Sequence, residues 1–276
     1  MAAKSSNCCP AESGSLWSAV SLVETRFITA RDGARVAYDV CGAGPGLILL
    51  HGGFVHDRQS WHTSGYVEKL QAAFTVITID IPGHGESDKP EDAESYAADR
   101  LIADVEHVGK ACGLSRFAVW GFSFGASLAL QLAARSQRVT RAIAAGSYFG
   151  PLFSDEQLKM MIGQMETIAR AQAEGRLDEL PAQQQSFANQ AHLPAAIAAM
   201  KGLAAWPTVW PEDLLCPTLV YCGSKNTQAR QALEKLTNRI VGARAEIKIL
   251  PEFDHMQEFT EIDTVLPVVR EFLSKA

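Results

Sequence analysis

The stretch that decides the fold is Phe117–Ala134, which reads FAVWGFSFGASLALQLAA. Its opening apolar residues suit a buried strand, and the residues after 125 suit a helix. Between them, residues 121–125 read GFSFG, the G-x-S-x-G pattern of a sharp strand-to-helix turn. Flanking glycines remove side chains that would clash there. The turn leaves the Ser123 hydroxyl at a helix N-terminus, where free N–H groups favour developing negative charge. The stretch therefore predicts a nucleophilic serine.

Strands and helices alternate around this turn. The predicted strands are Val23–Thr29, Ala34–Val40, Gly46–Leu50, Phe74–Ile79, Arg116–Trp120, Val139–Ala145, Pro217–Tyr221 and Ala245–Leu250. The predicted helices are Ala97–Cys112, Phe124–Ala134, Gln228–Val241 and Thr264–Lys275. The first two strands are joined by Arg31-Asp32-Gly33, a hairpin signal. An antiparallel start followed by alternation predicts an α/β fold with a mostly parallel sheet.

Three segments organise the chain. Residues 1–22 are small and polar, and we interpret them as an N-terminal extension. Residues 23–149 and 211–276 form the predicted α/β core. Between them, residues 150–210 show no strand signal but contain a capping box at Ser154–Gln157 and apolar residues at helical spacing. We therefore predict a helical cap over one edge of the sheet, controlling entry to the site.

Composition narrows the function classes. The 276 residues carry a net charge of −6 without a long basic run, which argues against nucleic acid and anionic membranes as partners. The longest uncharged apolar run, Gly46–Gly53, is too short to span a bilayer, and the first 25 residues lack an apolar signal-peptide core. The six cysteines form no CxxC pair, which favours free thiols in a reducing compartment and a cytoplasmic location. The oligomeric state stays open.

Two further glycine-rich segments follow predicted strands. His51-Gly52-Gly53-Phe54 could complete an oxyanion hole, with one N–H from Phe124 and the other from Gly53 or Phe54. We expect His51 to brace this loop rather than to react. Residues 80–87, DIPGHGES, suit a turn that shapes the sheet edge, and we do not expect His84 to be a catalytic base.

Together these features resemble the α/β-hydrolase superfamily, over about residues 24–276. The matching features are residues 51–53, Trp61, residues 80–87, residues 121–125 and a late histidine. The resemblance implies an eight-stranded, mostly parallel sheet with helices on both faces and a helical cap after the sixth strand. It also implies a serine, acid, histidine order along the chain. Because the family places its base after the last strand, the resemblance assigns that role to His255.

The acid departs from the family pattern. The family places Asp or Glu at the fourth position of G-x-x-D after the seventh strand, but residues 223–226 read GSKN, so Asn226 occupies the acid position. The alternative loop, residues 146–150, has no carboxylate before Asp155. Four interpretations remain open. Asn226 orients His255; another carboxylate, for example Asp57 or Asp254, substitutes; the chain is an engineered Asp-to-Asn variant; or the protein is a non-catalytic binder.

The functional hypothesis is a serine hydrolase that cleaves an ester, lactone or related acyl bond through an acyl-enzyme. Aromatic residues near the predicted loops indicate a medium-sized hydrophobic substrate, and the candidate binding residues are Phe122, Tyr148, Phe149, Phe153, Trp206 and Trp210. No motif for a metal or an organic cofactor is present, so none is expected. The alternative is a ligand receptor or pseudoenzyme that retains the hydrolase pocket, which the Asn at position 226 favours.

Overall fold

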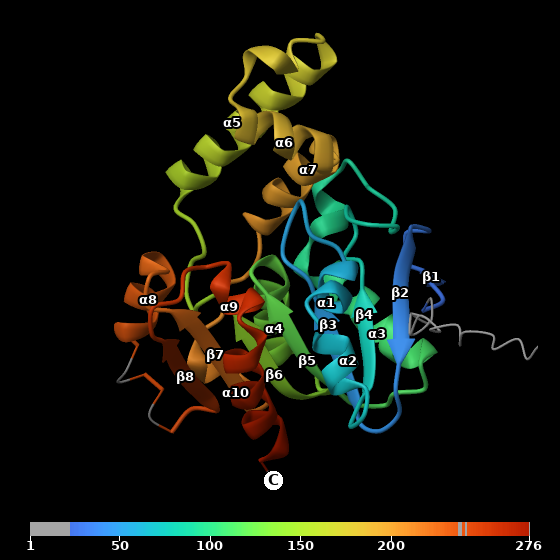
Figure 1. The fold of residues 1–276 in the computed structure, drawn as a ribbon, viewed down its shortest axis with the longest axis vertical. Helices are drawn as coiled ribbons and strands as arrows, with labels where there is room; N and C mark the ends of the chain where they lie inside the picture. The colour runs from blue at the N-terminus through green and yellow to red at the C-terminus, as the bar shows by residue number, and fades with distance from the viewer. Residues whose placement is uncertain (1–22, 237–238, 241, 276) are drawn as a thin grey trace, which may run out of the picture.

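The computed structural model describes residues 23–236, 239–240 and 242–275, so the predicted extension 1–22 lies outside the described residues. An eight-stranded sheet runs in the order β1-β2-β4-β3-β5-β6-β7-β8 (Figure 1). Its strands are β1 Arg26–Thr29, β2 Arg35–Cys41, β3 Gly46–Leu50, β4 Thr75–Ile79, β5 Phe117–Phe122, β6 Val139–Ala145, β7 Thr218–Gly223 and β8 Ala245–Leu250. Only the β1–β2 and β2–β4 pairs are antiparallel. The predicted sheet is confirmed, although β1 begins three residues later than predicted.

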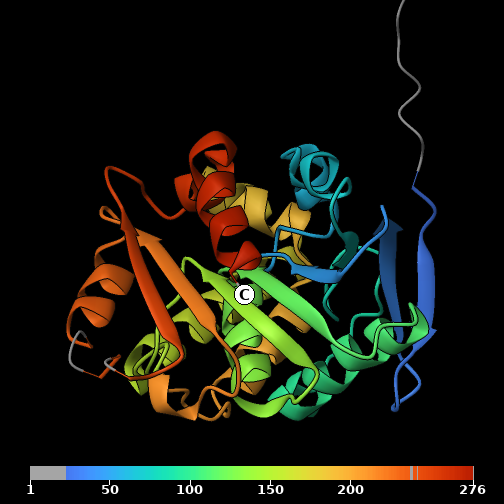
Figure 2. The same cartoon turned by 90° about the horizontal axis from the view of Figure 1, so that it is seen from below.

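Helices cover both faces of this sheet (Figure 2). In β3, Leu47 and Leu49 pack into one buried cluster, and Ile48 and Leu50 pack into the other, because successive side chains of a strand point to opposite faces. The first cluster includes residues of α1 Gln59–Thr63, α2 Tyr66–Leu70, α9 Gln257–Thr260 and α10 Ile262–Ser274. The second includes residues of α3 Ala98–Ala111, α4 Phe124–Arg135 and α8 Thr227–Glu234.

Helix ends and short helices were the least predictable elements. The sequence predicted no helix between residues 51 and 73, yet α1 and α2 lie there. Each has only five residues, too few for a periodic signal, and burial of Trp61 and Tyr66 stabilises them. Trp61 packs edge-on against Trp120 at 4.9 Å between ring centroids. The helix predicted over Gln228–Val241 is shorter, since α8 ends at Glu234.

Between β6 and β7 the chain forms helices, as predicted. These are α5 Asp155–Ala173, α6 Ala182–Gln190 and α7 Leu193–Leu203, with short 3-10 turns at Leu177–Glu179 and Pro211–Asp213. A third 3-10 turn, Ala93–Tyr96, precedes α3. The capping box at Ser154 and Gln157 is confirmed, with both reciprocal hydrogen bonds formed. Figure 1 shows α5, α6 and α7 standing above the sheet. We call residues 150–210 the cap segment.

Two further features concern the helices and the cysteines of the described part of the chain. None of its helices is long and apolar enough to cross a membrane. Its cysteines at 41, 112, 216 and 222 are free, and Cys8 and Cys9 lie outside the described residues. No disulfide joins any of these four cysteines.

Candidate active site

The turn between β5 and α4 holds Ser123 in the strained conformation that the sequence predicted. Its φ is 53° and its ψ is −110°, in a region that residues other than glycine rarely adopt. A Cβ on Gly121 would overlap the carbonyl of Gly125, and a Cβ on Gly125 would overlap the carbonyl of Leu50. Only glycine fits at these two positions. The serine hydroxyl is thereby presented at the N-terminus of α4.

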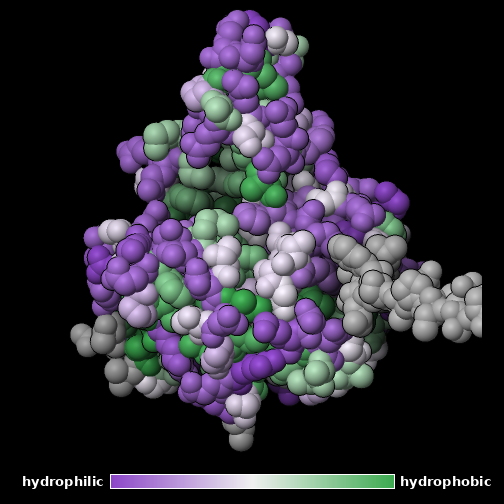
Figure 3. Space-filling view, viewed as in Figure 1, coloured by the Kyte–Doolittle hydropathy of each residue, from purple (hydrophilic) through white to green (hydrophobic). Residues whose placement is uncertain are grey.

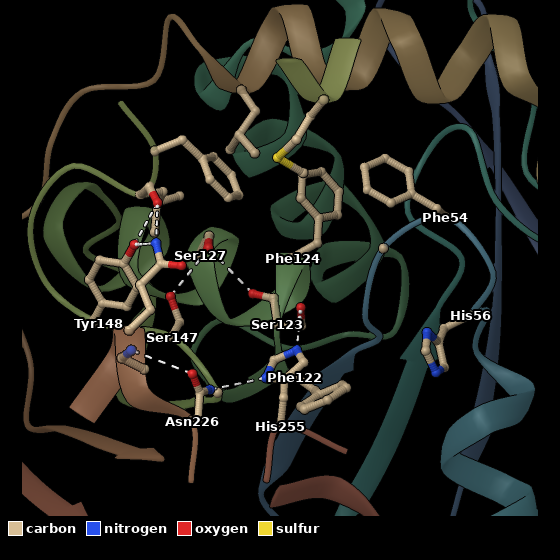
Figure 4. A pocket seen from close by; sticks show the side chains of 18 of the residues that line it. Phe54, His56, Phe122, Ser123, Phe124, Ser127, Ser147, Tyr148, Asn226 and His255 are labelled. Carbon is tan, nitrogen blue, oxygen red and sulfur yellow. Dashed lines mark hydrogen bonds between the residues drawn. The ribbon is translucent and has the colours of Figure 1, made fainter. Parts of the chain in front are cut away.

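His255 lies on the loop after β8 and faces Ser123 across the site (Figure 4). Its Nε2 is 3.1 Å from the Ser123 Oγ, which is hydrogen-bonding distance. The imidazole stacks on Phe122, with ring centroids 5.0 Å apart and planes 23° apart. The predicted serine–histidine pair is therefore brought together. This stacking leaves one ring nitrogen toward Ser123 and the other toward the protein interior.

The carboxylate beside His255 is Glu258, which the sequence analysis did not name. Its Oε2 lies 2.9 Å from the His255 Nδ1. Its Oε1 accepts hydrogen bonds from the Gly223 N–H at 2.6 Å and the Asn226 amide at 2.9 Å. The residue has no exposed surface. A buried carboxylate with donors on both oxygens is held in one orientation, and Nδ1 of His255 must carry the proton between them.

Neither carboxylate suggested from sequence contacts His255. Asp57 accepts from the backbone N–H of Gln59. Asp254 accepts from the N–H groups of Met256 and Gln257. Both therefore stabilise the start of a turn or short helix, and the expectation that either replaces the acid is wrong.

Asn226 lies where the sequence placed it, next to His255, but its amide is directed at Glu258. Its Oδ1 caps α8 by accepting from the Ala229 N–H, which identifies Nδ2 as the inward group. This Nδ2 is 2.9 Å from Glu258 Oε1 and 3.2 Å from His255 Nδ1. Because the His255 Nδ1 donates to Glu258, the 3.2 Å contact between Nδ1 and the Asn226 Nδ2 joins two donors and is not a hydrogen bond. The useful bond of Asn226 is the one to Glu258.

A sequence signal for Glu258 existed. His255 and Glu258 are three residues apart, a spacing that places side chains on one face of a helical turn. Gly146 supplies the space for both, since a Cβ there would overlap the Glu258 carboxylate and the His255 ring. The family pattern places the acid on the loops after the sixth and seventh strands, and neither loop contains Glu258. The carboxylate that contacts His255 instead comes from α9, after His255 in the chain.

The structure separates the two candidates for the second oxyanion donor. The Phe54 N–H donates to the His84 Nε2 at 2.7 Å and is therefore occupied. The N–H groups of Gly53 and Phe124 have no acceptor among the described residues. A Cβ on Gly53 would lie 3.3 Å from the Phe124 Cβ, so these two residues are neighbours in the site. Phe54 is thus removed from the predicted hole, and Gly53 remains.

A cavity of about 400 Å³ opens beside Ser123 and His255, in the range of small-molecule sites. Of the predicted binding residues, Phe122, Tyr148 and Phe153 line it. Phe149 does not, because it is 2% exposed in the core. Trp206 lines a smaller adjoining cavity of about 100 Å³. Trp210 lines neither and packs against Gly150 and Arg239.

Several lining residues were not predicted. Most are apolar or weakly polar: His56, Ser127, Ser147, Leu152, Met161, Met200, Leu203, Gln228, Ala229 and Met256. Met161, Met200 and Leu203 come from the cap segment, and Figure 3 shows hydrophobic surface in the hollow beneath it. Ser127 could have been found, since it lies one helical turn after Ser123. No cluster of three or more potential metal ligands occurs among the described residues.

Comparison with known families identifies the family to which this fold belongs. Residues 46–197 match the sequence profile of the alpha/beta hydrolase fold family. The match covers more than half of the chain and includes the strand that leads to Ser123.

Individual relatives are more distant. An epoxide hydrolase 4 of Mus musculus is 33% identical over 39% of this chain and 30% of that protein, so the match spans under a third of its length. A putative 2-succinyl-6-hydroxy-2,4-cyclohexadiene-1-carboxylate synthase of Bacillus subtilis is 24% identical over 90% of this chain and 97% of that protein. A solved thermophilic esterase of Thermogutta terrifontis is 23% identical, with a TM-score of 0.71 over 91% of this chain and 98% of that one. This likeness shows the fold alone.

Proposed function

Because the chain belongs to the α/β-hydrolase fold family, we propose that it is a serine hydrolase of hydrophobic ester, lactone or related acyl substrates. The observation that carries the proposal is the chain of contacts from Ser123 through His255 to Glu258. Nucleophile, base and acid follow one another at 3.1 Å and 2.9 Å, beside a cavity. This arrangement fulfils the geometric roles of a catalytic triad.

In the proposed first step, the Ser123 Oγ attacks the acyl carbon while the His255 Nε2 takes its proton. The negative charge that develops on the acyl oxygen lies at the N–H groups of Phe124 and Gly53. Each donor of this kind is worth about 3–4 kcal/mol in the transition state. The imidazolium then gives its proton to the leaving oxygen, the bond to that oxygen breaks, and an acyl-serine ester remains.

The second step repeats the chemistry with water. Water donates a proton to His255 and attacks the acyl-serine, and the Ser123 oxygen leaves with the proton that His255 returns. In both steps Glu258 stabilises the imidazolium and keeps Nδ1 protonated. Asn226 acts on Glu258 rather than on the substrate.

The cap segment sets the substrate class in this proposal. Met161 of α5 and Met200 and Leu203 of α7 face the same cavity as Phe122 and Phe153. These apolar side chains favour an acyl or aromatic group over a sugar or a peptide. Flexible methionines on separate helices suit a lid that adapts to substrates of different size. In this proposal the core, residues 23–149 and 211–276, carries the reacting groups, and the cap segment, residues 150–210, covers the cavity.

The receptor alternative loses its main support. It rested on the absence of a carboxylate at position 226, and Glu258 now provides one beside His255. A binding protein would gain nothing from a strained serine with its hydroxyl 3.1 Å from an imidazole. We therefore keep the enzyme proposal and make the receptor an outcome of the test.

A fluorophosphonate probe tests the proposal most simply. The chain should be labelled at Ser123, and the Ser123→Ala variant should not. A panel of p-nitrophenyl esters, lactones and an aryl epoxide should then give turnover for esters or lactones. Absence of labelling and of ester or lactone turnover in the folded chain would overturn the proposal in favour of a receptor. Turnover confined to the epoxide would overturn it in favour of the activity named for the mouse relative.

A further inference from the structure

We propose that His51 and His84 are positioning residues that hold two consecutive peptide groups of the oxyanion loop, so that Gly53 rather than Phe54 donates to the acyl oxygen. The inference rests on the proposed acyl-transfer chemistry, but the hydrogen bonds that support it belong to the loop and do not depend on that chemistry. Both rings are buried, at 0% and 5% exposure, and meet edge-to-face with centroids 4.9 Å apart. Neither ring takes part in the proposed proton transfers.

His51 fixes the first peptide group. Its Nδ1 lies 2.6 Å from the Gly52 carbonyl oxygen and must therefore donate to it, while its Nε2 accepts from the Ile81 N–H at 3.0 Å. In a trans peptide the C=O and the following N–H point in opposite directions. A Gly52 carbonyl directed at His51 therefore turns the Gly53 N–H away from His51. Gly53 lines the cavity together with Ser123.

His84 fixes the next peptide group. Its Nε2 accepts the Phe54 N–H at 2.7 Å, and its Nδ1 donates toward the carbonyls of Ile81 at 3.1 Å and Pro82 at 3.2 Å. Phe54 has a φ of 65°, a left-handed conformation that a bulky residue adopts only when its surroundings hold it. The bond to His84 supplies such a hold.

The two rings share one anchor. His51 accepts from the N–H of Ile81 and His84 donates to the C=O of the same residue. Each ring is consequently neutral, protonated on Nδ1 and unprotonated on Nε2. Burial lowers the pKa of both groups, that of His84 to about 4, which keeps this arrangement intact at neutral pH. The DIPGHGES turn, which the triad does not use, thereby acquires a role in the reaction.

A matched pair of substitutions isolates the bond to Phe54. In His84→Gln the side-chain oxygen reaches the position of Nε2 and accepts the Phe54 N–H. In His84→Asn the amide reaches only the position of Nδ1, so the contact to Ile81 survives and the bond to Phe54 is lost. We expect kcat to fall about 10²–10³-fold in His84→Asn, the range for a lost oxyanion donor, with KM within threefold. His84→Gln should recover at least tenfold of this loss.

Binding of a trifluoromethyl ketone should weaken in His84→Asn by the same factor as kcat, since this probe forms an oxyanion at Ser123. Equal loss in the two variants, or none in either, would overturn the inference. If wild-type protein shows no acyl transfer at all, the proposed function fails. The loop geometry can then still be judged separately by the next measurement.

Magnetic resonance of the wild-type protein keeps the inference falsifiable if a variant does not fold. A through-hydrogen-bond coupling between the Phe54 amide nitrogen and the His84 Nε2 should be observed without any ligand. On addition of the trifluoromethyl ketone, the Gly53 and Phe124 amide protons should move downfield, and the Phe54–His84 coupling should persist. Loss of that coupling with a downfield shift of Phe54 would show that Phe54 is the donor and would overturn the inference.

Discussion

Asp80 and Glu258 are both fully buried and bound by similar numbers of donors, yet they differ in the charge that accompanies them. Asp80 accepts from the backbone N–H groups of Arg58 and Glu86, and its third donor is the Arg58 guanidinium, a permanent cation. Glu258 accepts from Gly223, Asn226 and His255. Within the described chain it has no ion pair with Lys or Arg.

In the proposed mechanism, this difference separates a structural carboxylate from one that takes part in the reaction. Asp80 keeps its contact with the Arg58 cation whether or not His255 is protonated, so its charge does not depend on the reaction. The charge of Glu258 is met only by neutral donors until His255 takes the Ser123 proton. At that moment an ion pair forms in a buried setting, where it is stronger than in water. In this proposal the negative charge of Glu258 has no cationic partner in the resting site and gains one, the His255 imidazolium, in the transition state.

The largest expected effect follows from removing that charge. Glu258→Gln should lower kcat by about 10²–10⁴, or roughly 2.7–5.5 kcal/mol, as loss of the acid does in serine proteases. The new amide would also donate to Nδ1 and impose the wrong tautomer on His255. The free energy of unfolding should change by less than about 1 kcal/mol, because the size is unchanged. Ester hydrolysis and urea unfolding measure the two. A stability loss that accounts for the whole rate loss would contradict the assignment.

Removing the Arg58 cation beside Asp80 should have the opposite effect: a loss of stability with little loss of kcat. Arg58→Met leaves Asp39 and Asp80 buried without their partner, since the Arg58 side chain is 2% exposed. The free energy of unfolding should fall by about 3–5 kcal/mol, whereas kcat of the folded fraction should stay within threefold. Arg176→Met is the matched control, because its ion pairs with Glu174 and Glu179 are exposed and should contribute less than about 1 kcal/mol. Similar losses in the two variants would remove the contrast.

Acid provides a further test, because a buried imidazole that is neutral in the folded protein binds a proton more readily once the chain unfolds. Burial lowers the pKa of His84 to about 4, below its ordinary value of 6.5. The unfolded chain then binds more protons between these values, so stability is present above pH 6.5 and is lost as pH falls toward 4. The His84 contribution between pH 7 and pH 5 is about 2 kcal/mol. The free energy of unfolding, measured at several pH values, should fall less between pH 7 and pH 5 in His84→Gln than in the wild type. An unchanged slope in that variant would exclude His84 as its source.

A smaller effect is expected from a second carboxylate. Asn226→Asp places an acidic oxygen where Nδ2 now lies 2.9 Å from Glu258 Oε1. Two like charges at this distance raise the pKa of one carboxylate and remove a hydrogen bond from Glu258. We expect kcat at pH 7 to fall about tenfold, or roughly 1.4 kcal/mol. A rise of a hundredfold would instead mean that residue 226 is the functional acid position and that this chain lacks its native charge.

Sequence was sufficient where a local pattern fixes the structure. Five-residue apolar runs gave the buried strands, and the GFSFG turn gave Ser123, because a strained elbow between strand and helix admits few residues. His255 followed from the resemblance to the α/β-hydrolase superfamily, which implies a base after the last strand. These features depend on neighbours within a few residues.

Sequence was insufficient where distant segments decide the partner of a side chain. Glu258 is the acid candidate because α9 turns it back under His255 and because Gly146 leaves room for it. The Phe54 N–H is occupied because His84, thirty residues later, accepts it. The positions of Phe149 near a predicted loop and of Trp210 at the end of the cap segment do not show which way their side chains point, and packing directs both away from the pocket. Each of these outcomes depends on tertiary contacts between segments that are distant in the sequence.

The central claim is that Glu258 supplies the charge beside His255, and exchanging the two polar partners tests it most directly. The rate of acyl-enzyme formation from a p-nitrophenyl ester should be measured for wild type, Glu258→Gln and the double variant Asn226→Asp/Glu258→Gln. The double variant returns one carboxylate to within reach of Nδ1, since Asn226 Nδ2 is 3.2 Å from it. We predict at least a tenfold gain over Glu258→Gln. A Glu258→Gln rate within threefold of wild type would contradict the claim, as would a double variant no faster than Glu258→Gln.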